Sequence, residues 1–136
     1  EIYESRAAIA GYFARKAFEH FTSEDVAALK TLIEEQLAFG QQGDVYNYML
    51  KDAEFHRYSM GKHPNETLRE LHTKLTERIF PFGMRNAASE ARVQQAIREH
   101  RRIVRCIENQ DGGAIVGAVE EHIMNSYIEL TGVGRF

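Results

Sequence analysis

Three histidines and one aspartate stand at positions from which their side chains could bind a metal ion. Asp52 and His56 are four residues apart, a spacing that places two side chains one turn apart on the same face of a helix. His100 and His122 each lie in the middle of a later stretch in which apolar residues recur at helical spacing. Imidazole and carboxylate groups are ligands of zinc, nickel, iron and manganese in proteins. The four residues therefore predict a divalent metal site.

The same residues leave a metal-free interpretation open. A histidine on an apolar helix face is commonly buried in proteins, with its ring held by a hydrogen bond. Asp52 is harder to explain in this way, because an unpaired carboxylate inside a core is costly. The alternative to a metal site is thus a helical interaction domain that contains buried hydrogen bonds between Asp52 and the histidines.

A mononuclear metalloenzyme is a further alternative, because three histidines and a carboxylate around an ion with an open position could activate water. No general base stands out to support it. Glu99 and Glu121 each directly precede a histidine of the candidate set, so we expect them to point away from the ligand face. We therefore expect the chain not to be an enzyme.

Other catalytic patterns are missing from the sequence. No histidine has an acidic residue three positions before it, as a carboxylate-bridged di-iron bundle requires, and there is no HExxH, P-loop, GxGxxG or GxSxG motif. Cys106, the single cysteine, lies beside an apolar stripe and is expected to be a small core or boundary residue. The remaining histidines, which are His20, His63 and His72, are expected at the surface or at helix boundaries.

The elements that position these residues are predicted to be helices throughout. The chain contains two prolines and no segment of alternating polar and apolar residues that would indicate a strand. Capping residues, glycines and prolines divide it into about six helices, over residues 2–20, 23–40, 45–60, 64–80, 90–109 and 112–131. The fourth helix is expected to present Leu68, Leu71, Leu75 and Ile79 to the core and to end at Pro81. The predicted fold class is all-α, an antiparallel bundle of about six helices that encloses a metal or ligand cavity.

Composition narrows the class of protein. The chain has 136 residues, which suits one domain with its own core. The net charge of −3 argues against a nucleic-acid-binding surface, and no apolar run is long enough for a membrane span. A single cysteine and the lack of a signal peptide suggest a cytoplasmic location. The first residue is Glu1 rather than Met, as expected for a piece of a longer protein.

The sequence resembles the effector-binding C-terminal domain, the FCD domain, of FadR-type regulators in the GntR family of transcription regulators. The similar segments begin with YESRAAIAGYFARKAF and continue with TSEDVAALKTLIEEQ, DAEFHRYSMGKHPNETLRELHTKL and EHRRIVRCIENQDGGAIVGAVEEHI. The D-x-x-F-H-R segment and the later E-H-R and E-H-I are the most specific parts. The resemblance extends over residues 1–136 and implies an effector-binding and dimerisation domain, with a winged-helix DNA-binding domain expected upstream.

The resemblance implies the roles of particular residues. In the metal-binding branch of the family one Asp and three His hold a divalent ion, and these correspond to the four candidate residues above. Zinc is the first expectation, with nickel, manganese or iron as alternatives. Arg6 corresponds to the arginine that meets the carboxylate of a small organic acid effector. Asn125 could hydrogen-bond that ligand or be a satisfied polar residue at the bundle edge, and Tyr48 could either direct its hydroxyl to the cavity or mainly pack. The expected partners are the acid and a second copy of the chain, with DNA contacted only through the upstream domain and no membrane involved.

Overall fold

The structure is a computed structural model in which residues 1–133 are described. It confirms the all-α class, because these residues form six α-helices and one short 3₁₀ helix and contain no strand. The elements are α1 (Ile2–Ala17), η1 (Phe18–His20), α2 (Ser23–Gln41), α3 (Val45–Met60), α4 (Glu66–Asn86), α5 (Glu90–Glu108) and α6 (Gly112–Thr131). None of these helices is both long and apolar enough to cross a membrane.

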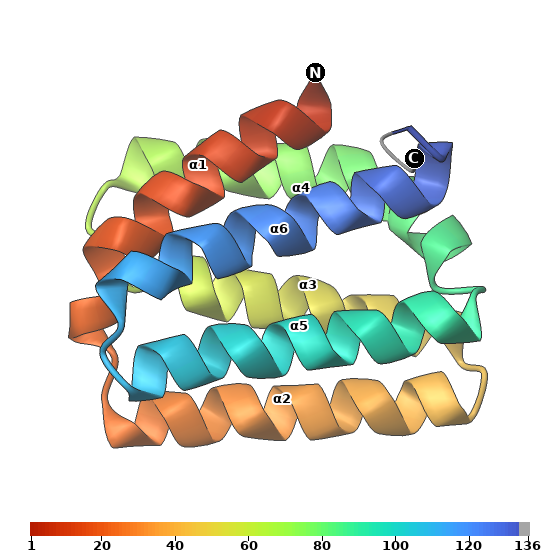
Figure 1. The fold of residues 1–136 in the computed structure, drawn as a ribbon, viewed down its shortest axis with the longest axis horizontal. Helices are drawn as coiled ribbons and strands as arrows, with labels where there is room; N and C mark the ends of the chain where they lie inside the picture. Colours follow the sequence, from red (N-terminus) through yellow and green to blue (C-terminus); the bar gives the residue numbers. More distant parts are fainter. Residues whose placement is uncertain (134–136) are drawn as a thin grey trace.

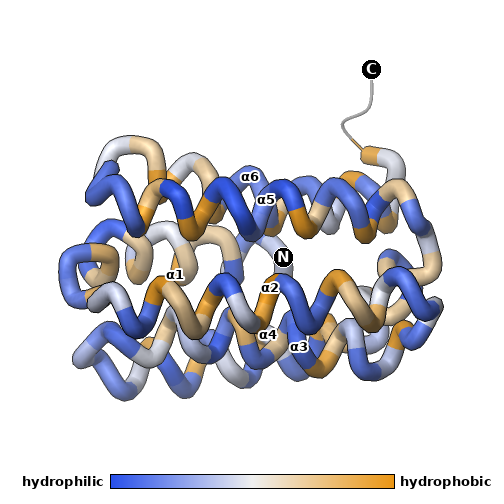
Figure 2. The backbone as a smooth tube through the Cα atoms, turned by 90° about the horizontal axis from the view of Figure 1, so that it is seen from below, coloured by the Kyte–Doolittle hydropathy of each residue, from blue (hydrophilic) through white to orange (hydrophobic). Residues whose placement is uncertain are grey.

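The helices lie roughly parallel to a common long axis and form a bundle (Figure 1). Helix α5 packs against both α2 and α6, α6 packs against α1, and α3 packs against α2 and α4. Apolar residues recur among polar ones along the helices (Figure 2). Recurrence at helical spacing gives a helix one apolar face suited to the interior. The links between consecutive helices are short, and consecutive helices therefore run in opposite directions.

Side-chain caps fix where most helices begin. Five helices start at a residue whose side chain accepts a hydrogen bond from a backbone N–H of the first turn, and these residues are Thr22, Asp44, Asn65, Ser89 and Asp111. Four of the five starts agree with the sequence prediction. The fourth helix begins at Glu66 behind the Asn65 cap, so Pro64 precedes the helix and does not occupy its first turn.

The predicted end of the fourth helix at Pro81 is wrong. Helix α4 continues through Pro81 to Asn86. A proline inside a helix leaves the carbonyl four residues earlier without its N–H partner, here the carbonyl of Glu77. Both Pro81 and Glu77 are exposed, so this carbonyl can be hydrated.

The predicted position of His72 is also wrong, because it is 3% exposed in the middle of α4. His63 lies at the predicted helix boundary, between α3 and α4, and is 6% exposed. The inward face of α4 runs through His72 and Ile79, whereas Leu71 lies beside this face and is 45% exposed. His63 packs edge-on against the ring of Phe13, with ring centroids 4.5 Å apart, and its Nδ1 accepts the backbone N–H of Asn65.

Candidate metal and ligand site

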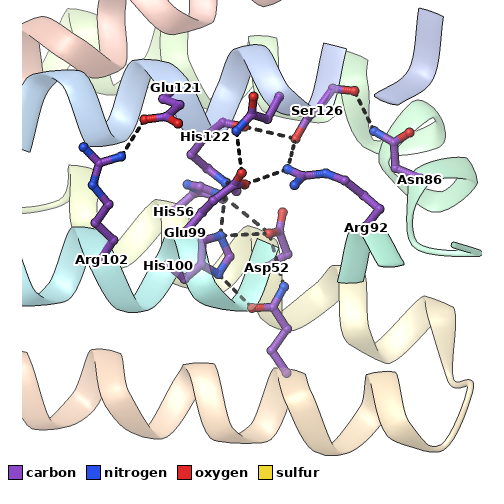
Figure 3. Close-up of polar contacts among 12 residues, drawn as sticks. Asp52, His56, Asn86, Arg92, Glu99, His100, Arg102, Glu121, His122 and Ser126 are labelled. Carbon is purple, nitrogen blue, oxygen red and sulfur yellow. Dashed lines mark hydrogen bonds and ion pairs between the residues drawn. The ribbon is translucent and has the colours of Figure 1, made fainter. Parts of the chain in front are cut away.

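The four predicted ligands converge on one point inside the bundle (Figure 3). Helix α3 contributes Asp52 and His56, α5 contributes His100, and α6 contributes His122. The Nε2 atom of His122 lies 3.1 Å from Nε2 of His100 and 3.2 Å from Nε2 of His56. The Oδ1 atom of Asp52 closes the ring, at 3.4 Å from Nε2 of His100 and 3.5 Å from Nε2 of His56. All three histidines are at least nine-tenths buried.

Helix lengths bring these residues to one depth. The link between α5 and α6 covers residues 109–111 only. His100 lies eight residues before the end of α5 and His122 ten residues after the start of α6, so both side chains are about 12 to 15 Å from the link. On α3, Asp52 and His56 are four residues apart, so their side chains lie on the same face of the helix.

Neighbouring acceptors fix the protons of two of the imidazole rings. The Nε2 amide nitrogen of Gln36 donates to Asp52 Oδ1 at 3.3 Å, so its Oε1 oxygen faces His100 and accepts from the Nδ1–H of that ring at 2.9 Å. The Nδ1–H of His122 donates to Glu99 Oε1 at 2.8 Å. In the neutral form, a ring held in this way presents an unprotonated Nε2 toward the centre of the site. Two such nitrogens 3.1 Å apart repel each other unless a proton or a cation lies between them.

The separations of the ligand atoms suit a divalent ion. With metal–ligand bonds near 2.1 Å, adjacent ligand atoms lie about 3.4 Å apart in a tetrahedral site and about 3.0 Å apart in an octahedral site. The four contacts of the ring measure 3.1 to 3.5 Å, in the range of adjacent ligand atoms around one ion, and all four atoms lie within 4.8 Å of one another. The donor set of three imidazoles and one carboxylate therefore fits the metal that the sequence predicts.

The electrostatics of the site keep Asp52, His56 and His100 in the protonation states that a metal requires. Burial lowers the pKa of His56 to about 4, although the adjacent Asp52 partly opposes this shift. Burial likewise holds the pKa of His100 well below its ordinary value. Burial would raise the pKa of Asp52, but the neighbouring imidazoles, His56 first, hold it far below the usual range. At neutral pH His56 and His100 are therefore neutral and Asp52 is ionised.

A cavity of about 50 Å³ adjoins this cluster. Its lining includes Asp52, His56 and His122 together with Arg6 of α1 and Tyr48 of α3. The structure thus brings two of the three predicted effector-binding residues to the cavity beside the cluster. Tyr48 is 4% exposed, and burial raises the pKa of its hydroxyl.

Asn125 does not line the cavity. Its side-chain amide donates to Glu99 Oε2 at 2.6 Å. Asn125 therefore helps to position Glu99, which in turn accepts a hydrogen bond from His122. Of the two interpretations offered for Asn125, the structure matches a polar residue whose hydrogen bond is satisfied within the protein.

The sequence-based expectation for Glu99 is wrong, whereas that for Glu121 is correct. Glu121 is exposed and pairs with Arg102, away from the cluster. Glu99 instead turns inward and accepts hydrogen bonds from His122, Asn125 and Arg92. Burial alone would raise the pKa of Glu99, but the hydrogen bond from His122 and the charge of Arg92 lower it. Glu99 is thus an ionised residue that orients a ligand ring.

Replacing Glu99 with glutamine is expected to weaken zinc binding by about 10- to 100-fold, since the orienting acceptor of His122 loses its charge. Isothermal titration of the metal-free domain with zinc measures the effect. Glu121→Gln is the matched control, because Glu121 also directly precedes a ligand histidine but faces solvent. Equal zinc affinities of the two variants would contradict the orienting role.

The metal-free domain is expected to lose stability as the pH falls from about 6.5 to about 4. Burial lowers the pKa of His56 to about 4 and that of His72 to about 3, so the unfolded chain binds protons in this range that the folded chain does not. The free energy of unfolding should therefore decrease with falling pH, by up to several kcal/mol.

Urea unfolding of the chelator-treated domain at pH 7 and pH 4.5 checks this expectation. His72→Leu should show a smaller decrease than the parent, because it removes one of the buried histidines whose pKa is lowered. His20→Ala is the control, since His20 is exposed. An unchanged free energy of unfolding between the two pH values would contradict the assignment.

Three residues of the site were missed by the sequence reasoning: Gln36, Glu99 and Arg92. Gln36 is fully buried on α2, and Arg92 is 3% exposed on α5. The available signal was helical spacing, because Arg92 and Glu99 are seven residues apart, which places both on one face two turns apart. Gln36 follows Ile33 by three residues and so continues the apolar face of α2.

The comparisons with known proteins agree with this fold. The model of the FCD domain family matches residues 1–125 of the chain. The chain therefore belongs to the FCD domain family, which confirms the resemblance that the sequence motifs indicated. A search of curated proteins by sequence finds no match.

Among solved structures, E. coli McbR/YncC is similar, with a TM-score of 0.86 and 19% sequence identity. The match covers 96% of this chain and 66% of that chain, so the present chain spans 66% of the length of that protein. At this level of identity the likeness shows the common fold alone.

Proposed function

We propose that this domain senses a small organic acid at a divalent ion held by Asp52, His56, His100 and His122, as part of a GntR-family transcription regulator. Membership of the FCD family supports a ligand-sensing regulatory role. The observation that carries the proposal is the ring of four ligand atoms, with two imidazole nitrogens 3.1 Å apart, beside a cavity inside the bundle. Zinc is the metal we propose first, because imidazole and carboxylate groups are among its usual ligands in proteins.

When bound, the divalent ion would supply a Lewis-acid position for a carboxylate oxygen of the acid. Three of the four candidate metal ligands also line the cavity, namely Asp52, His56 and His122. A ligand in the cavity would therefore be next to the ion. His100 is 0% exposed and completes the set from the opposite side, where Gln36 orients it. Glu99 accepts hydrogen bonds with both carboxylate oxygens and does not line the cavity, so it is not placed as a general base for water.

Arg6 supports recognition of an acid. Its side chain is 4% exposed, and its Nε–H has no hydrogen-bond partner within residues 1–133. Burial lowers the pKa of this guanidinium, although the charge of Asp52 opposes the shift. A buried cation with unused donors is unfavourable unless an anion joins it. A carboxylate in the cavity would satisfy Arg6 through charge-assisted hydrogen bonds.

We further propose how the acid signals. Arg6 lies on α1, whereas the metal ligands lie on α3, α5 and α6. An acid that binds both Arg6 and the ion would favour one placement of α1 relative to these helices. In a cytoplasmic homodimeric regulator, with its winged-helix domains before α1, this placement would set the spacing of the two DNA-binding domains.

Thermal unfolding with and without metal tests the proposed function. We expect carboxylates to raise the melting temperature of the zinc-loaded domain, and to have little effect on the chelator-treated domain. The acid should be recovered chemically unchanged after incubation. Stabilisation that does not depend on metal would contradict the proposed site, and steady consumption of the acid would favour a metalloenzyme.

A further inference from the structure

We propose that the acid recognised by this domain carries two carboxylate groups and that Arg92 binds the second one. This inference rests on the proposed function and names the class of its ligand, a short-chain dicarboxylate. It is carried by Arg92, a buried arginine that lines the same cavity as Arg6 and that no sequence motif indicated.

Arg92 has an unused donor group at the cavity. Its side chain is 3% exposed, and its Nη2 donates to Ser126 Oγ at 2.8 Å and to Glu99 Oε1 at 2.9 Å (Figure 3). The Nη1 group is buried and has no hydrogen-bond partner in the part of the chain that the structure describes. Leaving a charged donor unsatisfied is costly, so the site is incomplete without an acceptor.

Arg6 repeats this arrangement from another helix. Arg6 on α1 and Arg92 on α5 both line the cavity, and each has a buried N–H group without a partner. The two guanidinium groups stand on separate helices and keep separate unused donors. Each unused donor needs an acceptor oxygen, in addition to the oxygen that would bind the ion.

The charge balance of the site indicates the same ligand. The carboxylates of Asp52 and Glu99 balance the guanidinium groups of Arg6 and Arg92, which leaves the metal-free site neutral. A divalent ion adds two positive charges, and the described residues of the cavity lining contain no further carboxylate to offset them. A dianion restores neutrality, whereas a monocarboxylate leaves one buried positive charge uncompensated.

The second carboxylate must lie close to the first. Glu99 Oε1 accepts from both His122 Nδ1 and Arg92 Nη2, so the guanidinium of Arg92 is separated from a metal ligand by one carboxylate group. Ser126, which also binds Arg92, is one helical turn beyond His122. The cavity of about 50 Å³ holds roughly three to five water molecules. These dimensions suit an acid of about two to four carbons.

The test compares matched acids on the zinc-loaded wild-type domain. Oxalate, malonate and succinate are titrated calorimetrically against acetate, propionate and butyrate at constant ionic strength, with protein-bound zinc measured in each sample so that removal of the ion is not counted as binding. We expect at least one dicarboxylate to bind about tenfold or more tightly than the monocarboxylate of equal carbon number. Monocarboxylates that bind as tightly as their partners would overturn the inference and leave the proposed function intact. Binding of none of the six acids would overturn both.

Arg92→Gln separates ligand binding from a purely positioning role toward Glu99. The variant should lose the preference for the dicarboxylate, about tenfold or more, while its affinity for the monocarboxylate changes by less than about twofold. Arg98→Gln, an exposed change on the same helix, should keep the preference. An equal loss for both acids would show that Arg92 acts only through Glu99, and would overturn the inference. If the variant does not fold, the wild-type comparison still decides.

Discussion

The His100→Ala variant of this domain is expected to bind zinc more than about a hundredfold more weakly than the parent. His100 is fully buried, and its Nε2 lies 3.1 Å from that of His122 and 3.4 Å from Asp52 Oδ1. Its removal leaves three ligands and exposes the ion to water on one side. The loss should exceed the 10- to 100-fold typical of residues that only orient a ligand. Competition with a chromophoric chelator measures the affinity.

Two further variants make the result on His100 specific. Asp52→Asn changes a ligand with little change of shape and should weaken zinc binding as well, so a folding defect of His100→Ala does not decide the outcome. His20→Ala removes an exposed histidine of η1 and should bind zinc like the parent. If His100→Ala and His20→Ala bound zinc equally well, the assignment of the ligands would be wrong.

The Arg6→Met variant is expected to be more stable than the parent and yet unable to bind the acid. Arg6 is buried with an unsatisfied Nε–H, and this donor gains a carboxylate acceptor only when the ligand enters the cavity. Replacing it with an apolar side chain of similar length should raise the free energy of unfolding by about 1–3 kcal/mol in the absence of ligand. For a chain of this size that corresponds to roughly 3–10 °C in melting temperature. Affinity for the acid should fall about a hundredfold or more, because a charge-assisted bidentate contact is lost in a buried site.

Calorimetric titration of the zinc-loaded variant and thermal unfolding of the ligand-free variant measure the two effects separately. Arg15→Met, on the same helix but exposed, is the control and should change neither. Zinc affinity should be retained, since Arg6 is not a ligand. An Arg6→Met variant that was less stable than the parent and bound the acid normally would show that Arg6 is a packing residue.

The candidate metal ligands were predictable because each one interrupts a regular pattern. Asp52, His56, His100 and His122 occupy apolar helical stripes at positions where a polar side chain is unexpected, and the structure brings all four together. Most helix starts were also predictable, because capping residues are recognised from the local sequence alone. The fold class needed no tertiary information, since helical spacing and the shortage of prolines and β-branched runs already excluded strands.

The residues around the ligands could not be predicted in this way. Glu99 lies beside the inward stripe of α5, and its side chain reaches the cluster only because α6 places His122 within 2.8 Å of it. The unusual burial of Arg92 depends on Ser126, which is 34 residues later in the chain. Such partners are set by the packing of helices against one another, which local periodicity does not contain. The errors at His72 and Pro81 have the same origin, because tertiary contacts and exposure outweighed local preference.

The most direct test of the account is the metal content of the reconstituted domain. The chelator-treated protein is dialysed against a small excess of zinc and then against metal-free buffer, and retained zinc is measured by elemental analysis. We expect about one zinc ion per chain for the parent and almost none for His100→Ala. No retained zinc in the parent, or equal retention by the two proteins, would contradict the proposal that Asp52, His56, His100 and His122 hold a divalent ion.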